Sequence, residues 1–223
     1  MIRAVILDLD NTLYAYEPLS AEAAAKVRTF ICGRLKITEP QYEEAFRFGR
    51  EQTKRQLGET GASHNRLLYF QKALEYLGVA PMPLSLQIYE IYWSTFLEKM
   101  SLRDGAREFM ECMKKHGMRI MICTDLTAHI QHRKIEALGI AEEINFLVTS
   151  EEAGVEKPAP EVFAFCLEKL KLSAEEVCFI GDDLRKDVEG AKAAGMRAIL
   201  YRPEEPEAAQ FAAMAEEILQ QNG

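Results

Sequence analysis

The sequence contains no uncharged apolar segment long enough to span a membrane. It also shows no secretion signal, because the first apolar run, residues 4–7, is short and ends at the acidic residues Asp8 and Asp10. The five cysteines form no C-x-x-C pair and are odd in number, which argues against a disulfide framework. We therefore expect reduced thiols in a cytoplasmic protein that has no membrane partner.

Basic residues are also in deficit. The 27 Lys and Arg are outnumbered by 35 Asp and Glu, and the formal net charge is −8. General binding to nucleic acid needs basic side chains for the phosphates, so we expect no nucleic-acid partner. With 48% hydrophobic and 28% charged residues, the 223-residue chain has the composition of a globular protein and the length for one core with a smaller insert.

Five short apolar runs, rich in aliphatic and β-branched residues, are typical of buried parallel strands. They cover residues 2–9, 118–123, 146–149, 177–180 and 198–201. Helices separate the later runs: Thr127 is a candidate cap for the first, Gly139 follows its end, and Pro160 opens the second. These helices cover residues 127–138, 160–170, 186–194 and 204–219. The alternation predicts an α/β fold with a Rossmann-like, doubly wound parallel sheet.

One segment breaks this alternation. Residues 15–99 contain no convincing strand, and their apolar residues recur at helical spacing, with glycine and proline at the breaks. The predicted helices cover residues 21–34, 39–57, 64–77 and 84–100. We therefore expect a small all-helical domain at 15–99, inserted into an α/β domain that is formed by residues 1–14 and 100–223.

The first predicted strand ends in the sequence D-L-D-N-T, residues 8–12. Asp8 and Asp10 are two residues apart and therefore point the same way, at the carboxyl end where open α/β sheets place ligands. Two adjacent carboxylates repel each other unless a cation lies between them. A hard divalent cation such as Mg²⁺ suits oxygen ligands. A surface turn with two solvated acids is the alternative.

Three later features follow predicted strands in the same way. Thr124 stands after the second run and just before a helix, where a hydroxyl and free amides form an anion site. Lys157 lies in the loop after the third run and offers a positive charge to a phosphate or to Asp8. The run G-D-D-L-R-K-D, residues 181–187, follows the fourth and adds carboxylates at the same edge. Each feature alone has a commonplace explanation, but their order along the chain is specific.

In this order of motifs the chain resembles the haloacid dehalogenase-like superfamily, from residue 8 to about residue 195. The matching residues are Asp8, Asp10, Thr12, Thr124, Lys157, Gly181, Asp182 and Asp187. The resemblance implies a Rossmann-like sheet with the first strand in its centre and a helical cap domain between the first motif and the second.

The resemblance also implies a role for each motif. Asp8 would be the nucleophile that takes up the phosphoryl group, and Asp10 would act first as an acid and then as a base. Thr124 and Lys157 would hold the phosphoryl oxygens. Mg²⁺ would be bound by Asp8, Asp182 and the backbone carbonyl of Asp10.

Three other acids have less specific roles. Asp183 and Asp187 are expected to orient Lys157 or a metal-bound water. Asp125 stands where many relatives have Asn, and a carboxylate beside a bound phosphate is unfavourable unless it is paired. The candidate partners are His129 and Arg133.

The insert carries a basic and polar stretch around a predicted loop that Gly58 and Gly61 flank. In capped relatives the leaving group meets the cap, so His64 and Arg66 are candidates for contact with an anionic or polar substrate. A solvated helix face is the alternative.

The sequence therefore predicts an enzyme, an Mg²⁺-dependent phosphomonoesterase whose partner is a small phosphorylated metabolite. Asp10 favours phosphoryl chemistry over dehalogenation, because the dehalogenases of the superfamily lack this second acid. Two alternatives remain open: a phosphotransferase or mutase of the β-phosphoglucomutase type, and a non-catalytic binding protein that keeps the fold.

Overall fold

The computed structural model describes residues 1–220, and these divide into two compact units. One unit consists of residues 1–16 and everything from Ser101 onward, and the other of Glu17–Met100. Each boundary lies within two residues of the position that we expected from the sequence. No helix among the described residues combines the length and the apolar character needed to cross a membrane.

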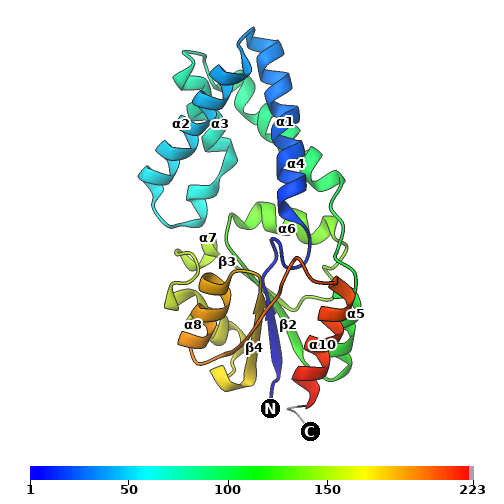
Figure 1. Cartoon of the computed structure of the whole chain (residues 1–223). Helices are drawn as coiled ribbons and strands as arrows, with labels where there is room; N and C mark the ends of the chain where they lie inside the picture. The colour runs from blue at the N-terminus through cyan, green and yellow to red at the C-terminus, as the bar shows by residue number, and fades with distance from the viewer. Residues whose placement is uncertain (221–223) are drawn as a thin grey trace. The chain divides into compact units, whose positions relative to one another are not determined.

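The first unit is built on a five-stranded sheet in which every strand pairs in parallel with its neighbours (Figure 1). Its order is β3-β2-β1-β4-β5, so the first strand is central, as the sequence predicted. The strands are β1 (Ala4–Leu7), β2 (Arg119–Thr124), β3 (Phe146–Thr149), β4 (Val177–Gly181) and β5 (Arg197–Leu200). The predicted α/β fold class is confirmed.

Helices cover both faces of this sheet, which is why β1 is a continuous apolar run rather than an alternating one. Ala4 and Ile6 lie in one core with α8 (Pro160–Leu170) and α9 (Gly190–Ala193). On the other side of the sheet lie α5 (Ala106–Lys115) and α10 (Glu207–Gln220), as Figure 1 shows. These two helices are in contact through Phe109 and Phe211, whose ring centroids are 5.8 Å apart.

The helices of the sheet unit follow the sequence prediction in part. The helix α8 begins and ends at the predicted residues, whereas α5 and the short α7 (Ser150–Ala153) were not predicted. The predicted helix at 186–194 starts earlier, as a π-helical turn over Leu184–Glu189 that α9 continues. A short 3₁₀ turn, Ala174–Glu176, precedes β4.

The helix α6 (Ala128–Ala137) ends as predicted, because Gly139 has a positive φ of 65°. Its beginning differs from the prediction. Thr127 stands at the cap position, but its side chain makes no capping hydrogen bond. Glu151 accepts from the amide of Ala128 at 2.8 Å instead, and a carboxylate suits the positive end of a helix.

The second unit, described by itself, is all-helical, as the sequence predicted. It contains α1 (Tyr16–Leu35, starting at the boundary), α2 (Glu39–Leu57), a 3₁₀ turn (Gly61–His64), α3 (Arg66–Tyr76) and α4 (Met82–Glu98). Thr38 and Gln41 form a capping box that fixes the start of α2. The interior is aromatic: Trp93 is 1% exposed, and its indole ring lies 5.0 Å from the ring of Tyr92. These rings stabilise the unit as its core.

Candidate active site

The carboxyl end of the sheet gathers the predicted polar residues of the first unit. Leu7 pairs with Ile122 of β2 and with Ile180 of β4, so the residues that follow these strands meet at one edge. A pocket of about 180 Å³ lies there. Its lining residues are Asp8, Asp10, Asn11, Thr124, Asp125, Lys157, Asp182, Asp183, Lys186 and Asp187. The structure thus brings together all the site residues that we predicted outside the insert.

Lys157 lies between two carboxylates at the base of the pocket. Its ammonium donates to Asp8 at 2.6 Å and to Asp187 at 2.7 Å, and it also donates to the carbonyl of Cys123. All three charged side chains are nearly inaccessible to solvent. The interaction is therefore a buried triad of one cation and two anions, in which each charge depends on the others.

The buried triad shifts the pKa of its members. Burial raises the pKa of Asp8 well above its ordinary value; Lys157 opposes the rise, and Asp187 adds to it. Burial lowers the pKa of Lys157, but the charges of Asp187 and Asp8 outweigh it and hold that pKa well above its usual range. One cation does not balance two carboxylates, so a second cation at this place would favour the ionised form of Asp8.

A group of acids is placed to hold such a cation. Asp8, Asp182 and Asp187 each offer a carboxylate oxygen, and these oxygens lie within 4.8 Å of one another. Burial and the charge of Asp187 raise the pKa of Asp182 to about 6. Thr12 links Asp8 and Asp182, since its hydroxyl lies 3.2 Å from the carboxylate of Asp182 and 3.3 Å from that of Asp8. An all-oxygen set of this kind suits a hard divalent cation.

Asp10 was also expected at the metal, through its backbone carbonyl, and its side chain turns to other partners. Its carboxylate accepts from Lys134 at 2.7 and 2.9 Å and from the hydroxyl of Tyr14 at 2.6 Å. We did not predict either partner. A signal for Lys134 was present, because it interrupts the apolar face of α6 beside Ile130 and Ile135, where a buried lysine needs an anion.

Thr124, at the end of β2, is oriented by a second residue that we did not predict. The amide nitrogen of Gln131 donates to the hydroxyl of Thr124 and to the carbonyl of Asp125, both at 2.7 Å. Gln131 is fully buried, and its own side-chain oxygen has no hydrogen-bond partner among residues 1–220. The helix α6 thus contributes two side chains to the site: Gln131, which contacts Thr124, and Lys134, which contacts Asp10.

The cation beside Asp125 is Lys186, at 2.8 Å, so the expected partners, His129 and Arg133, were wrong. The other oxygen of Asp125 accepts from the backbone amide of Lys157. Lys186 lies in the π-helical turn that follows β4 and lines the pocket, so the partner of Asp125 comes from a segment distant in sequence. Asp125 is therefore paired and joins two loops.

The two acids of the following loop have different positions. Asp187 accepts from Lys157, as described, and its second oxygen accepts from the amide of Asp183 at 3.1 Å. Asp183 caps the π-helical turn, because its side chain accepts from the amides of Arg185 and Lys186 at 2.9 Å each. Asp187 thus contacts the group that it was expected to orient, whereas Asp183 shapes the loop.

Comparison with known proteins agrees with these motifs. The family model of the haloacid dehalogenase-like hydrolases matches residues 2–195. The chain belongs to the haloacid dehalogenase-like hydrolase family. This confirms the resemblance that the sequence indicated.

Several relatives of this haloacid dehalogenase-like hydrolase are named as phosphatases. The chain is 41% identical over 208 residues to the ribulose-1,5-bisphosphate 5-phosphatase of Halopiger xanaduensis, a match that covers 92% of this chain and 87% of the relative. It is 32% identical to the glyceraldehyde 3-phosphate phosphatase of Methanopyrus kandleri, with 91% and 84% covered. The prediction of an enzyme, a hydrolase of the phosphatase type, is confirmed.

A solved structure shows the same fold. The 2-haloacid dehalogenase of Pseudomonas syringae pv. Tomato superposes with a TM-score of 0.77 over the whole of both chains, at 22% identity. At that identity the likeness supports the architecture of this haloacid dehalogenase-like chain and not its chemistry.

The two candidate substrate residues of this hydrolase lie in the helical unit. His64 ends the 3₁₀ turn, and Arg66 begins α3. The guanidinium of Arg66 stacks over the rings of Tyr92 and Trp93, 4.7 and 5.0 Å from their centroids. Arg66 thus contributes to the packing of its own unit, and the contact of either residue with substrate stays a prediction.

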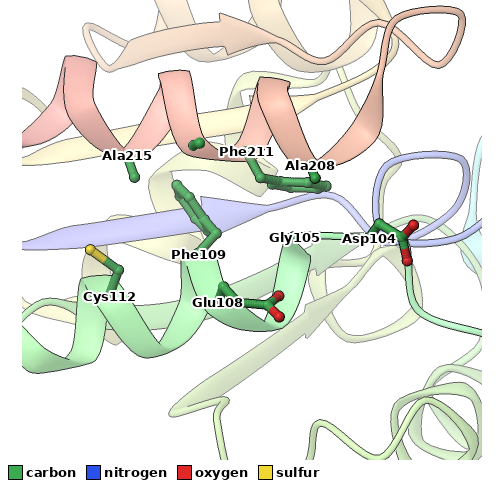
Figure 2. Close-up of a pocket in the computed structure, with 9 residues that line it drawn as sticks. Asp104, Gly105, Glu108, Phe109, Cys112, Ala208, Phe211 and Ala215 are labelled. Atoms are coloured by element: carbon green, nitrogen blue, oxygen red, sulfur yellow. The ribbon is translucent and has the colours of Figure 1, made fainter.

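A larger pocket of the hydrolase lies away from the motifs. It has a volume of about 650 Å³ and is lined by side chains of α5 and α10, among them Phe109, Cys112 and Phe211 (Figure 2). Among the described residues 1–220, Asp104 and Glu108 are the only acids that line this pocket, and no basic side chain lines it. Size alone would favour it as the ligand site, but of these two pockets the smaller one brings together a buried carboxylate, a cation and a set of acids.

Proposed function

We propose that the chain is a magnesium-dependent phosphomonoesterase of a small sugar phosphate, which acts through an aspartyl-phosphate on Asp8. The observation that carries the proposal is the placement of Asp8. It is a buried carboxylate at the end of the central strand, held by Lys157 and grouped with Asp182 and Asp187. A carboxylate so placed and facing a pocket is suited to attack on phosphorus.

The chemistry assigned to the residues runs in two steps. One oxygen of Asp8 forms a bond to phosphorus while the bond from phosphorus to the leaving oxygen breaks, and Asp10 gives that oxygen a proton. A water molecule then attacks the phosphorus, Asp10 takes its proton, and the bond to Asp8 breaks to release inorganic phosphate. Lys157 and the hydroxyl of Thr124 hold the phosphoryl oxygens through both steps.

Asp8 and Asp182 would hold Mg²⁺, whose positive charge would offset the repulsion between an anionic nucleophile and an anionic phosphate. The carboxylate cluster fits a hard cation, as does the raised pKa of Asp8, which a nearby cation would lower. The side chain of Asp187 lies within the same cluster, but its contact with Lys157 assigns it first to positioning.

The names of the relatives support hydrolysis of a small sugar phosphate as the reaction. Those described above act on ribulose bisphosphate and on glyceraldehyde 3-phosphate, by their names. Both are small sugar phosphates, and 41% identity over 208 residues is high enough to carry a substrate class into a proposal. We therefore propose a phosphorylated sugar of three to five carbons as the substrate class.

The experiment measures inorganic phosphate released from ribulose 1,5-bisphosphate, glyceraldehyde 3-phosphate and p-nitrophenyl phosphate. It compares Mg²⁺ with EDTA, and the native protein with Asp8→Asn and with Asp104→Asn, an exposed acid outside the site. We expect metal-dependent release by the native protein and by Asp104→Asn, and none by Asp8→Asn. Release that survives Asp8→Asn would contradict the mechanism. Consumption of a sugar phosphate without release of phosphate would favour a mutase.

A further inference from the structure

We infer that Lys134, together with Tyr14, is a positioning residue that fixes the carboxylate of Asp10 for proton transfer to the leaving group and from water. This inference rests on the proposed function and deepens it. Lys134 lies on α6, far along the chain from the motif that contains Asp10, and it belongs to none of the motifs that suggested the chemistry.

The burial of the two charges is unequal. The side chain of Lys134 is 0% exposed, whereas that of Asp10 is 29% exposed and lines the pocket. Removing an ammonium from water costs several kcal/mol, which a partly exposed ion pair hardly recovers. Apolar packing at this position of α6 would cost less. The lysine is therefore placed where its stabilising contribution is small and its geometric effect on Asp10 is large.

The contacts define which oxygen of Asp10 is fixed. Oδ1 accepts from both Lys134, at 2.7 Å, and the hydroxyl of Tyr14, at 2.6 Å. Oδ2 accepts at 2.9 Å from Lys134, and within residues 1–220 it has no second donor. Oδ2 thus accepts fewer hydrogen bonds than Oδ1, and we assign to it the exchange of the proton.

The donors are themselves held in place. The ammonium of Lys134 lies 5.7 Å from the ring centroid of Tyr14 and 5.6 Å from that of Tyr16, so two aromatic rings border it. Tyr14 is fully buried, which holds its hydroxyl in place as a donor to Oδ1. Asp10 and Tyr14 also form a backbone bridge. Asp10 is therefore held both by hydrogen bonds to its carboxylate and by a bridge to its backbone.

The experiment compares Lys134→Met with the native enzyme and with Lys192→Met, which makes the same change at an exposed lysine. Each protein is assayed with a sugar phosphate, whose leaving alkoxide needs a proton, and with p-nitrophenyl phosphate, whose leaving group does not. The burst of nitrophenol before steady state reports the first step alone, and kcat reports both steps.

For Lys134→Met we expect kcat on the sugar phosphate to fall about 10- to 100-fold, within the usual contribution of acid–base catalysis, with KM unchanged. The p-nitrophenol burst keeps its amplitude and rate, and the steady state that follows is slowed because Asp10 still has to accept the proton of water. Tyr14→Phe gives a smaller loss of the same pattern. Lys192→Met behaves as the native enzyme.

Equal losses of burst rate and of sugar-phosphate turnover in Lys134→Met would overturn the inference, because they would indicate a general structural defect. So would native kcat on the sugar phosphate. If Lys134→Met does not fold, Tyr14→Phe and Lys134→Arg decide between the same two patterns. A native enzyme that releases phosphate from neither ester would overturn the proposed function itself, and the inference with it.

Discussion

Gly181 ends β4 directly beside the carboxylate of Asp187. A methyl group added at Gly181 would overlap the oxygen and carbon atoms of that carboxylate, so the position has room only for glycine. Asp187 holds Lys157, and Lys157 holds Asp8. The space at Gly181 therefore contributes to the position of Asp8, the proposed nucleophile.

We predict that Gly181→Ala lowers kcat on the order of 10²-fold, because it displaces Asp187 and with it Lys157 by a substantial part of an ångström. Steady-state kinetics measure the loss, and far-ultraviolet circular dichroism checks that the variant is folded. A folded Gly181→Ala protein with native kcat would show that the position of Asp187 does not matter to the reaction.

Among the individual residues of the site, the sequence allowed us to predict those at strand ends but not the side chains that hydrogen-bond to them. Asp8 and Asp182 follow strands and Thr124 ends one, and strand ends meet by topology alone. Lys134 and Gln131 reach the site from the middle of a helix, and their contacts depend on how that helix packs. In the sequence, such residues can be recognised only as polar side chains on an otherwise apolar helix face that is expected to be buried.

At the level of the helices, Gly49 of α2 lies directly against the backbone of α3. A methyl group added at Gly49 of α2 would overlap the carbonyl oxygen of Tyr69 and come to 3.0 Å from the amide of Ala73, both backbone atoms of α3. Backbone cannot rotate away as a side chain can. The packing of this helix pair therefore depends on Gly49.

We predict that Gly49→Ala destabilises the protein by about 1–3 kcal/mol, the usual range for overpacking. Gly33→Ala in α1 is the matched control, because Gly33 is exposed and nothing lies within 4 Å of the added atom. That change should stabilise by about 0.5–1 kcal/mol, through the lower entropy of the unfolded chain. Urea unfolding measures both, and a loss of stability in Gly33→Ala equal to that in Gly49→Ala would contradict the assignment.

The predicted helices were most accurate where local chemistry fixes an end. Pro160 opens α8, and the capping box of Thr38 and Gln41 precedes α2, so both starts could be predicted. The π-helical turn before α9 could not, because its side-chain hydrogen bonds, such as that from the amide of Asp183 to Asp187, do not follow from helix propensity. The helix α5 also has an apolar face that is visible in the sequence, but we did not predict a helix there.

For the molecule as a whole, the acids of the site would link the proposed metal binding to pH. The pKa of Asp182 is raised to about 6, against 3.8 for an unperturbed Asp, and that of Asp8 is raised as well. Between these values the folded metal-free protein binds a proton that the unfolded chain has lost. This contribution to stability is present below about 3.8 and is lost as pH rises through about 6.

Metal binding has the opposite dependence, because a bound cation needs ionised carboxylates. We predict that the rise in Tm on addition of a fixed concentration of Mg²⁺ is small at pH 5 and larger at pH 7. Differential scanning calorimetry measures the rise at each pH. An Asp182→Asn variant should show little rise at either pH, and an equal rise in the native protein at both would contradict the link to Asp182.

The central claim is that Asp8 takes up the phosphoryl group. The most direct measurement is mass spectrometry of the enzyme quenched in acid during turnover of a sugar phosphate with Mg²⁺. We expect a peptide containing Asp8 that is heavier by one phosphoryl group in the native enzyme, and no such peptide in Asp8→Asn. Steady release of phosphate with no phosphoryl group on Asp8 at any time of quenching, or with the group on another residue, would contradict it.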